Sequence, residues 1–522
     1  MGMKHGGALK RTSKFLLLFA SILSLFAAER YQEFYRPQFH FSPQMNWAND
    51  PCGLVYAFGK YQLFFQYNPY ANDWGHMSWG HAVSSDLVYW NQVPVAISED
   101  KKAAIFTGSS VFDANNTSGL CTSPKRGCIV SIYTGDTPKT ATTPERQTQN
   151  LAFSQDGRTW TKYAGNPVLD LGRSDTRDPK VFWYPPAGRW IMVIVLANEK
   201  KVRIFGSPNL RDWHYLSDFG PQGATSGVWE CPDLYRLPVP GLPGEMRWVL
   251  KVGLNPAHIP GGSGEQYFLG SFDGTRFHND YPPNEVHWLD YGRDCYCALT
   301  FNNAPNPQAP RMIGWMNNWD YARAVPTSPW RGAMTLPRVL SLSKSNGSFV
   351  LTQNPIPQLR SLRAEEFQYN GSNVTDLNRK LAAWPYRSQT FEMEAAVRPG
   401  SAKLIVWSLL QGQDDETLVG FDAVRRELFV DRSKCAGVHF SKLFPSRTVA
   451  PLNLSGEALR LHIFVDFSSV EVFAQAGKIA MTNLVFPRPA SRGISLRISD
   501  GKLEQVQLRI WRLRSIWKQT AE

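Results

Sequence analysis

The sequence is poor in charge and lacks the short motifs of several common enzyme classes. Only 19 % of its 522 residues are charged, against 43 % hydrophobic, which excludes a largely disordered chain. It has no Gly-x-Ser-x-Gly elbow, no His-Glu-x-x-His pair and no phosphate-binding loop, which disfavours the corresponding hydrolase, metalloprotease and nucleotide chemistries. Beyond residue 28 no stretch is apolar for long enough to cross a membrane as a helix. The length predicts two domains.

Residues 1–28 are expected to be a targeting segment. They carry four lysines and arginines and no acid, a third of the formal net charge of +12, followed by an apolar run over 15–26. This run is shorter than the roughly 20 residues of a spanning helix, so we predict a cleaved secretory signal, with an uncleaved anchor as the alternative. The remaining basic charge is spread along the chain. We therefore expect no nucleic-acid partner, and no membrane contact after cleavage.

The seven cysteines are few and odd in number, so at least one is unpaired. In an exported protein Cys121 and Cys128 could close a short loop. Cys295 and Cys297 lack the second pair of a structural zinc site, and strand alternation would put both on one face; no metal site is predicted. Glycosylation acceptor sequences agree with secretion and lie at Asn115, Asn116, Asn346, Asn370, Asn373 and Asn453.

Short strands and turns are indicated by 18 tryptophans, 40 glycines and 36 prolines. A Ser-x-Asp/Asn turn followed by an aromatic residue recurs at 84–90, 154–160, 207–213 and 271–277. Each copy follows a strand-like run and reads as a tight turn between two strands. A unit that recurs every 50–70 residues predicts a β-propeller. A fifth blade is expected from residues near 311–342 together with the N-terminal strand.

Three carboxylates follow the same repeat. Asp50, Asp178 and Glu230, and a polar stretch at 106–110, each precede the turn of their unit by about 30–45 residues and so fall on its opening strand. The opening strands of a propeller line its central channel, so the three acids should converge at one mouth. Retaining cleavage of a glycosidic bond needs one ionised carboxylate as nucleophile and one protonated carboxyl as acid. Trp47, Trp74, Trp79 and Trp229, close to these acids, are expected to form a sugar-binding floor.

The motifs around these acids resemble one known family. They are Trp47-Ala48-Asn49-Asp50-Pro51-Cys52-Gly53, Phe106-Thr107-Gly108-Ser109, Arg177-Asp178-Pro179 and Trp229-Glu230-Cys231-Pro232-Asp233, continued by Asp290-Tyr291-Gly292-Arg293-Asp294 and Asp466-Phe467-Ser468-Ser469-Val470-Glu471-Val472-Phe473. In order and spacing they resemble the β-fructofuranosidases of glycoside hydrolase family 32, which include invertases, exo-inulinases and levanases.

The resemblance implies an all-β chain, a five-bladed β-propeller followed by a C-terminal β-sandwich. It also implies that Asp50 is the nucleophile, that Glu230 is the general acid and then the base, and that Asp178 binds fructose hydroxyls and stabilises the transition state. No metal or organic cofactor is expected. The expected substrate-binding residues are Trp47, Asn49, Gln66, Trp74, Phe106, Ser109, Arg177 and Trp319.

The expected organisation is a signal at 1–28, a propeller at 35–345, a linker at 346–364 and a sandwich at 365–517. The sandwich is expected to support the propeller; a carbohydrate-binding role is the alternative. The predicted function is that of a secreted enzyme that releases terminal fructose from sucrose, inulin or levan. A fructosyltransferase and a non-catalytic fructan-binding protein are the alternatives. Ala48 and Cys52, where the family commonly has Met and often Asn, are expected to affect specificity and rate.

Overall fold

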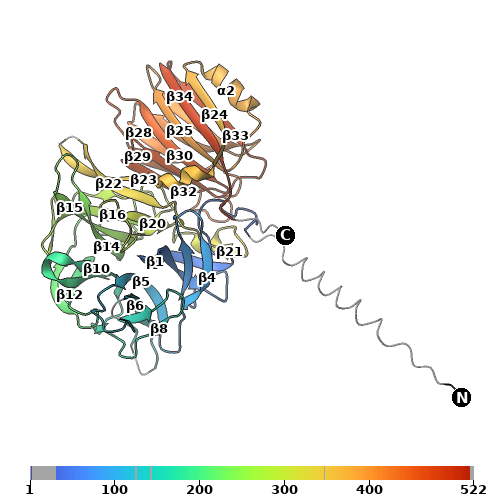
Figure 1. Ribbon diagram of the computed structural model, residues 1–522. Helices are drawn as coiled ribbons and strands as arrows, with labels where there is room; N and C mark the ends of the chain where they lie inside the picture. Colours follow the sequence, from blue (N-terminus) through green and yellow to red (C-terminus); the bar gives the residue numbers. More distant parts are fainter. Residues whose placement is uncertain (1, 3–30, 124–125, 142–143, 346, 518–522) are drawn as a thin grey trace.

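The computed structural model describes residues 2, 31–123, 126–141, 144–345 and 347–517, and its regular secondary structure consists almost entirely of strands (Figure 1). The predicted signal segment, apart from residue 2, and the acceptor Asn346 lie outside these residues. Within them α2 (Val374–Ala383) is the one α-helix, and no helix is long and apolar enough to span a membrane. Three short 3-10 turns are η1 (Pro185–Ala187), η2 (Ala322–Ala324) and η3 (Pro357–Leu362).

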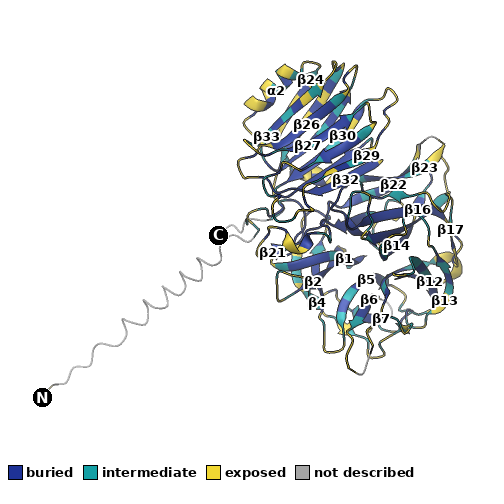
Figure 2. Cartoon of the chain, turned by 180° about the vertical axis from the view of Figure 1, so that it is seen from behind, coloured by how far each residue is buried: buried dark blue, intermediate teal, exposed yellow. Residues whose placement is uncertain are grey.

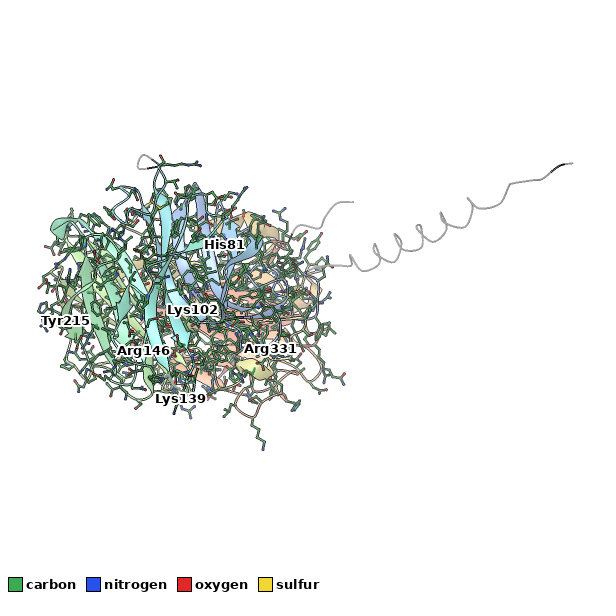
Figure 3. The ribbon with its side chains drawn as sticks, turned by 90° about the horizontal axis from the view of Figure 1, so that it is seen from below. His81, Lys102, Lys139, Arg146, Tyr215 and Arg331 are labelled. Atoms are coloured by element: carbon green, nitrogen blue, oxygen red, sulfur yellow. A yellow bond between two sulfur atoms is a disulfide. The ribbon has the colours of Figure 1, made fainter. Side chains whose placement is uncertain are left out.

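The first part of the chain forms five sheets in sequence order, antiparallel except where β21 pairs with β1. The first is β21-β1-β2-β3-β4, and the second is β5-β6-β7-β8 with β9 beside β7. Their strands are β1 (Asn46–Ala57), β2 (Lys60–Asn68), β3 (Ser78–Ser84), β4 (Asn91–Ile97), β5 (Ala104–Asp113), β6 (Cys128–Thr137), β7 (Arg146–Ser154), β8 (Thr161–Lys162), β9 (Leu169–Asp170) and β21 (Trp330–Arg331). Lys102, Lys139 and Arg146 lie toward one end of the second sheet (Figure 3).

The other three sheets follow the same plan. They are β10-β11-β12-β13, then β14-β15-β16-β17 with β18 beside β16, and β19-β20-β22-β23. Their strands are β10 (Thr176–Tyr184), β11 (Arg189–Leu196), β12 (Lys201–Ser207), β13 (His214–Phe219), β14 (Val228–Pro238), β15 (Met246–Asn255), β16 (Gly264–Phe272), β17 (Phe277–Asn279), β18 (His287–Trp288), β19 (Tyr296–Thr300), β20 (Arg311–Trp315), β22 (Arg338–Ser345) and β23 (Ser348–Pro355).

The first strands of the five sheets, β1, β5, β10, β14 and β19, are neighbours around a ring, which is the arrangement of a five-bladed propeller. Apolar clusters fill the spaces between adjacent sheets. Ile191, Leu250 and Trp229 belong to the cluster between the third and fourth sheets, for example. Figure 2 shows β1, β5 and β14 as buried, as expected for strands that line the centre.

The four predicted Ser-x-Asp/Asn turns are confirmed, and each joins the third strand of its sheet to the fourth. In the second sheet the Ser154 hydroxyl accepts the amide of Gly157, and Asp156 Oδ1 accepts the amides of Arg158 and Thr159. The same side-chain-to-backbone pattern recurs around Asp86, Asn209 and Asp273. The repeat in the sequence is therefore a turn whose amides are satisfied by its own polar side chains.

The fifth sheet differs from the prediction, because it contains no N-terminal strand. β1 remains in the first sheet, and the ring is closed by the two-residue strand β21, which pairs parallel to it through Asn46↔Trp330 and Trp47↔Arg331. The outermost strand of the fifth sheet is β23, at 348–355, within the residues expected to be a linker. It pairs along its full length with β22, so these residues complete the sheet instead of connecting the domains loosely.

The second part of the chain is a sandwich of two antiparallel sheets, β24-β34-β25-β30-β31-β32 and β29-β28-β27-β26-β33. Trp407, Met393 and Ile463 are fully buried in the core that the two sheets share. The strands are β24 (Arg363–Gly371), β25 (Phe391–Arg398), β26 (Leu404–Gln411), β27 (Thr417–Asp422), β28 (Glu427–Asp431), β29 (Arg447–Pro451), β30 (Leu459–Asp466), β31 (Ser469–Ala474), β32 (Ile479–Leu484), β33 (Gly493–Ser499) and β34 (Gln505–Leu513).

A buried set of charged side chains joins the two domains, and we call it the interdomain cluster. Its members come from the N-terminal segment, the propeller and the sandwich: His40, Asp290, Asp294, Arg338, Arg432, Asp466 and Glu471. Arg338 pairs with Asp290 at 3.0 Å and with Glu471 at 2.7 Å, and Arg432 pairs with Asp294 at 2.6 Å. The Asp290–Asp294 and Asp466–Phe473 motifs of the sequence thus build the interface between the domains.

Candidate active site

The five first strands share a local irregularity at one end of the ring. The pairing register shifts between Ala48 and Pro51, Ile105 and Gly108, Arg177 and Lys180, Glu230 and Asp233, and Tyr296 and Leu299. Such bulges turn side chains out of the regular alternation of a strand. Because the bulges lie at equivalent places in neighbouring strands, they aim the residues of the sequence motifs at a common point.

Asp50 lies in the bulge of β1. Its Oδ2 accepts a hydrogen bond of 3.0 Å from the Thr107 hydroxyl of β5, whereas its buried Oδ1 has no hydrogen-bond partner among the described residues. Burial and the charges of Asp178 and Glu230 raise the pKa of Asp50 to about 7. One oxygen of this carboxylate is therefore left without a protein donor.

Glu230 is held at both oxygens. Arg177 donates from Nε and Nη2 to Oε1, at 3.1 and 3.0 Å, and the buried Tyr296 hydroxyl donates to Oε2. Burial raises the pKa of Tyr296 well above its usual value, and the Glu230 charge adds to this. The phenol therefore remains a donor over the whole working range of pH.

Asp178 lies between these groups. Its Oδ2 accepts the backbone amide of Cys231 at 2.9 Å, and its own amide donates to the Thr134 hydroxyl. Burial raises the pKa of Asp178 to about 6, with Arg177 opposing and Glu230 adding to the shift. Three acids and one arginine thus lie close together, and burial together with mutual repulsion keeps a proton within the group near neutral pH.

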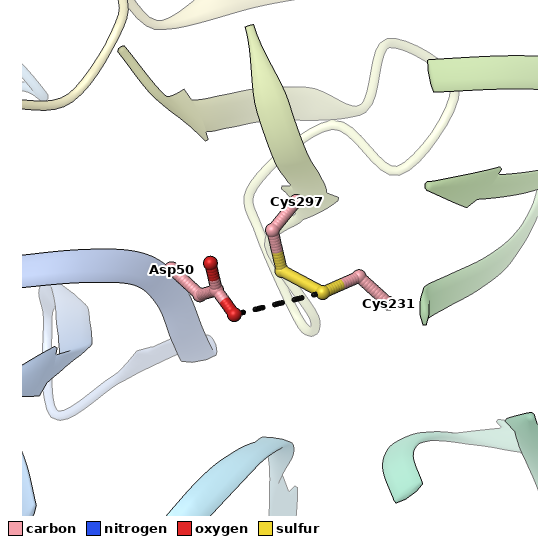
Figure 4. A group of neighbouring side chains, drawn as sticks. All are labelled: Asp50, Cys231 and Cys297. Carbon is pink, nitrogen blue, oxygen red and sulfur yellow. Dashed lines mark hydrogen bonds between the residues drawn. A yellow bond between two sulfur atoms is a disulfide. The ribbon is translucent and has the colours of Figure 1, made fainter. Parts of the chain in front are cut away.

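A disulfide between Cys231 and Cys297 lies beside Asp50, and the sulfur of Cys231 is 3.8 Å from Asp50 Oδ2 (Figure 4). A disulfide sulfur carries no proton, so this contact is van der Waals packing and not a donated hydrogen bond. The oxidised sulfurs also hold no free thiolate for a metal, which removes this trio of groups as a cation site. The other cysteine of the Cys295–Cys297 pair differs from its neighbour, because Cys297 is in this disulfide whereas Cys295 is a free buried thiol.

The predicted Cys121–Cys128 bridge is present, and it closes the loop that leads into β6. Cys52, Cys295 and Cys435 are free and buried. Ala48 and Cys52, the two departures from the family pattern, are both fully buried. Neither side chain opens space in the pocket, because Ala48 is packed in the core between the first and fifth sheets.

The predicted substrate-binding residues divide by exposure. Trp74 is 37 % exposed and packs at 6.3 Å from the ring of Phe106, while Phe106, Arg177 and Trp319 are partly exposed, so these four can contact a ligand. Trp47 is fully buried and donates its indole N–H to Asn49 at 2.8 Å. It therefore orients Asn49 instead of presenting a surface to sugar.

Three further expectations need correction or refinement. Ser109 is buried, and its hydroxyl accepts the amide of Val181, which ties the second sheet to the third. In the same stretch Thr107 is the residue that reaches a catalytic-site carboxylate. Trp79 and Trp229 are fully buried and donate to backbone carbonyls, so they are core and not a sugar-binding floor. Gln66 is buried, and its amide nitrogen has no hydrogen-bond partner in the part of the chain that the structure describes.

Sequence reasoning did not identify Thr107, Tyr296 and Cys297 as members of the site. Thr107 lies in the polar stretch that the repeat brings to the channel, so its place in the bulge was the available signal. Tyr296 and Cys297 lie on β19, in the part of the chain where the repeat has no Ser-x-Asp turn. No repeat in the sequence identifies β19 as the equivalent of the other four opening strands.

Comparison with known proteins gives one consistent result. Residues 40–355 match the model for the glycosyl hydrolases family 32 N-terminal domain, and residues 358–512 match the family 32 C-terminal model. A levanase of Bacillus subtilis is 43 % identical over 523 residues, spanning 98 % of this chain and 76 % of that protein. An extracellular exo-inulinase of Aspergillus niger is 39 % identical over 94 % of this chain and 96 % of its own length.

Solved structures agree with these matches. The crystal structure of an exo-inulinase from Aspergillus awamori superposes with a TM-score of 0.86 at 36 % identity, over 94 % of this chain and 100 % of that one. A β-fructofuranosidase from Schwanniomyces occidentalis complexed with fructosyl-erythritol gives a TM-score of 0.83 at 32 % identity, over 94 % and 99 % of the two chains.

Proposed function

The chain belongs to glycosyl hydrolase family 32 and is a glycosidase, and from this premise we propose that it releases terminal fructose from fructosides by double displacement. The proposal rests above all on one observation. Asp50, Asp178 and Glu230 come from three different sheets to one point, where Asp50 keeps an oxygen that accepts no hydrogen bond from the described residues. Paired carboxylates in one site are the groups that retaining glycosidases use.

Asp50 acts as the nucleophile. It must be ionised to attack the anomeric carbon, and Oδ1 is the oxygen with no competing protein hydrogen bond. The bond from Thr107 to Oδ2 fixes the plane of the carboxylate. Attack forms a fructosyl–aspartate ester and breaks the bond from the anomeric carbon to the leaving oxygen, which takes a proton from the acid.

Glu230 acts as that acid, and afterwards as the base that activates water. Burial and repulsion keep a proton in the carboxylate group, and catalysis requires this proton on Glu230 while Asp50 is ionised. A bound fructoside favours that distribution, because its leaving oxygen accepts from Glu230 and its anomeric carbon gains positive charge beside Asp50. Arg177 and Tyr296 orient the carboxyl throughout.

Asp178 binds sugar hydroxyls and stabilises the positive charge of the transition state. Its Oδ2 is fixed by the amide of Cys231, so the carboxylate does not need to reorganise during the reaction. Arg177 lies 4.0 Å from Asp178 and moderates its repulsion with Glu230. No step requires a metal or an organic cofactor.

Sucrose, inulin and levan are the proposed substrates, because the relatives above are named levanase, exo-inulinase and β-fructofuranosidase. We also infer secretion, since relatives of this length are named extracellular and the two disulfides suit an oxidising compartment. Glycosylation of exposed acceptors such as Asn370 and Asn453 would accompany export from a eukaryotic cell.

The test is fructose release from sucrose, inulin and levan by the wild type and by the Asp50→Ala and Glu230→Ala variants. We expect monomeric fructose as the product, and loss of activity in both variants. Added azide should then give a fructosyl azide of retained configuration with Glu230→Ala and of inverted configuration with Asp50→Ala. Unchanged activity in either variant contradicts the roles, oligosaccharide growth at high sucrose favours a transferase, and no turnover favours binding alone.

A further inference from the structure

The Cys231–Cys297 disulfide joins two of the irregular strands that build the site. Cys231 immediately follows Glu230 in the bulge of β14, and Cys297 immediately follows Tyr296 in the bulge of β19. Cys231 has φ of 47° and Cys297 has φ of 45°, in the left-handed region that residues with a side chain rarely adopt. Such a backbone conformation is strained and persists only where its surroundings enforce it. A covalent bond between the two residues supplies that constraint.

The bridge also contacts the strand of the nucleophile. The Cys231 sulfur lies 3.8 Å from Asp50 Oδ2, and the Cys297 sulfur lies 4.0 Å from the carbonyl oxygen of Pro51. Both cysteines are buried, at 1 % and 0 % exposure. Strands of the first, fourth and fifth sheets therefore meet at this one bond, which lies beside Asp50 (Figure 4).

The residues next to the two cysteines form the hydrogen bond that orients the acid. Tyr296 donates to Glu230 Oε2, across the same gap between β14 and β19 that the disulfide spans. Lys251 from β15 donates to the carbonyl of Cys231 at 2.8 Å and holds the other side of the bulge. The position of Glu230 relative to Tyr296 therefore depends on two bulges that are linked through their neighbouring residues.

We propose that the Cys231–Cys297 disulfide is a positioning element of the active site, which fixes Glu230 against Tyr296 and packs against Asp50, so that turnover depends on the oxidised state of this bond. The inference rests on the roles proposed for Asp50 and Glu230. The cysteines touch no substrate and act through the acid and the nucleophile. Loss of the bond should lower kcat with little effect on KM, because the pocket residues Trp74, Phe106 and Trp319 are on other strands and loops.

The chain carries its own matched control. Cys121–Cys128 is a second disulfide, at the loop that leads into β6, and the sulfur of Cys121 lies 3.6 Å from the backbone carbonyl of Asp113. It spans 7 residues of sequence, whereas the bridge at the site spans 66. Removal of the control bridge should leave kcat and KM unchanged.

The experiment compares the double variants Cys231→Ala/Cys297→Ala and Cys121→Ala/Cys128→Ala with the wild type, at temperatures where circular dichroism shows each to be folded. Two substrates are used, sucrose and an aryl β-D-fructofuranoside whose leaving group departs without protonation. For the site variant we expect kcat on sucrose to fall about 10–100-fold and KM to stay within about twofold. The fall on the aryl fructoside should be clearly smaller, because a misplaced Glu230 matters less there.

Tyr296→Phe removes only the hydroxyl that donates a hydrogen bond to Glu230. This variant is included because the site variant could fail to fold. It should reproduce the same dependence on leaving group, with a fall of about tenfold on sucrose. A reduction experiment adds a third readout in the Cys121→Ala/Cys128→Ala background, where three cysteines are free and the remaining disulfide is the one at the site. Treatment with a water-soluble phosphine converts that disulfide to two thiols and the phosphine to its oxide, and activity should fall as those thiols appear.

The outcomes separate this inference from the proposed function. A wild type with no fructosidase activity overturns the proposed function itself. An active wild type whose kcat is unchanged in the site variant, in Tyr296→Phe and after reduction overturns the positioning role of the disulfide. An equal fall on both substrates contradicts an effect through the acid.

Discussion

The two buried charge clusters of this protein are built on opposite principles. In the interdomain cluster every acid has a cation or a set of amides: Glu471 pairs with Arg338 and His40, and Asp466 accepts His40 and two backbone amides. In the active site three acids share one arginine, and Asp50 keeps an unpaired oxygen. Arg338 and His40 hold the pKa of Glu471 below its usual value against the effect of burial, whereas the pKa of Asp50 rises to about 7.

The difference separates stability from function. Charges that are fully paired in a dry interior hold two domains in one arrangement, and removal of one partner leaves the other uncompensated. Acids that lie close together without enough cations repel one another, and this repulsion lowers the free energy of unfolding. The same repulsion favours retention of a proton, which a glycosidase has to deliver to the leaving group. Substitutions in the two clusters should therefore affect different measurements.

The largest expected effect is on activity in the catalytic cluster. Asp50→Asn should lower kcat on sucrose by roughly 10⁴-fold or more, because the attacking oxygen is lost. It should leave the melting temperature unchanged or raise it, since one of three repelling carboxylates is neutralised. A kinetic assay and a thermal melt on the same preparation measure kcat and the melting temperature. A large drop in the melting temperature would contradict the claim that the active-site acids do not stabilise the fold.

The converse is expected in the interdomain cluster. Arg338→Met should lower the free energy of unfolding by about 3–5 kcal/mol, because Asp290 and Glu471 lose their shared cation in a buried place. Below the melting temperature kcat should be retained. Denaturant titration measures the loss. Arg146→Met, which breaks the exposed pair with Asp170, is the control and should cost less than about 1 kcal/mol.

The interdomain cluster should also weaken at high pH. Burial lowers the pKa of His40, but Asp466 and Glu471 outweigh it and raise the pKa from 6.5 to about 9. A histidine whose pKa is raised in the folded state binds its proton more tightly there than in the unfolded state. This contribution to the free energy of unfolding is fully present below pH 6.5 and is lost as the pH rises through 9.

The shift corresponds to about 3 kcal/mol at full loss. The wild type should lose this much more free energy of unfolding between pH 6.5 and 10 than a His40→Gln variant does. Parallel curves for the two proteins would show that the histidine is not charged in the folded state.

The smallest expected effect is a shift in the pH profile of activity. Asp50 must be ionised, so kcat/KM should fall as the pH drops through about 7. Thr107→Val removes a hydrogen-bond donor to the Asp50 carboxylate. The midpoint of the acid side of the kcat/KM profile should therefore move up by about one pH unit, since a hydrogen bond to a charged group is worth about 1.5 kcal/mol.

Ser109→Ala is the matched control for that variant, because its hydroxyl bonds to the amide of Val181 and not to a carboxylate. The acid side of its kcat/KM profile should coincide with that of the wild type. If both variants shift the acid side of the profile by the same amount, the shift reports a general disturbance of β5 and not the loss of the hydrogen bond to Asp50.

Much of this architecture is predictable from local signals in the sequence. The Ser-x-Asp turns carry their own hydrogen bonds, so the repeat and the opening strands with Asp50, Asp178 and Glu230 follow from spacing alone. The closure of the ring does not, because β21 is two residues long and is defined only by its partner β1.

The details of the site depend on contacts between strands far apart in the chain. Cys231 and Cys297 are 66 residues apart, and seven cysteines admit many pairings. Ser109 was expected to face substrate, but the bulge in β5 precedes it and leaves it in regular alternation, turned toward the third sheet. The buried indoles of Trp79 and Trp229 likewise show that nearness to a catalytic motif in sequence does not predict exposure.

The most direct test of the central claim is to trap the covalent intermediate. A Glu230→Gln variant given an aryl β-D-fructofuranoside should form the fructosyl ester rapidly and hydrolyse it slowly, because the leaving group needs no acid while water lacks its base. Peptide mass spectrometry should then find one fructosyl unit, attached to Asp50. A label on Asp178, or turnover with no labelled peptide, would contradict the assignment of Asp50 as the nucleophile.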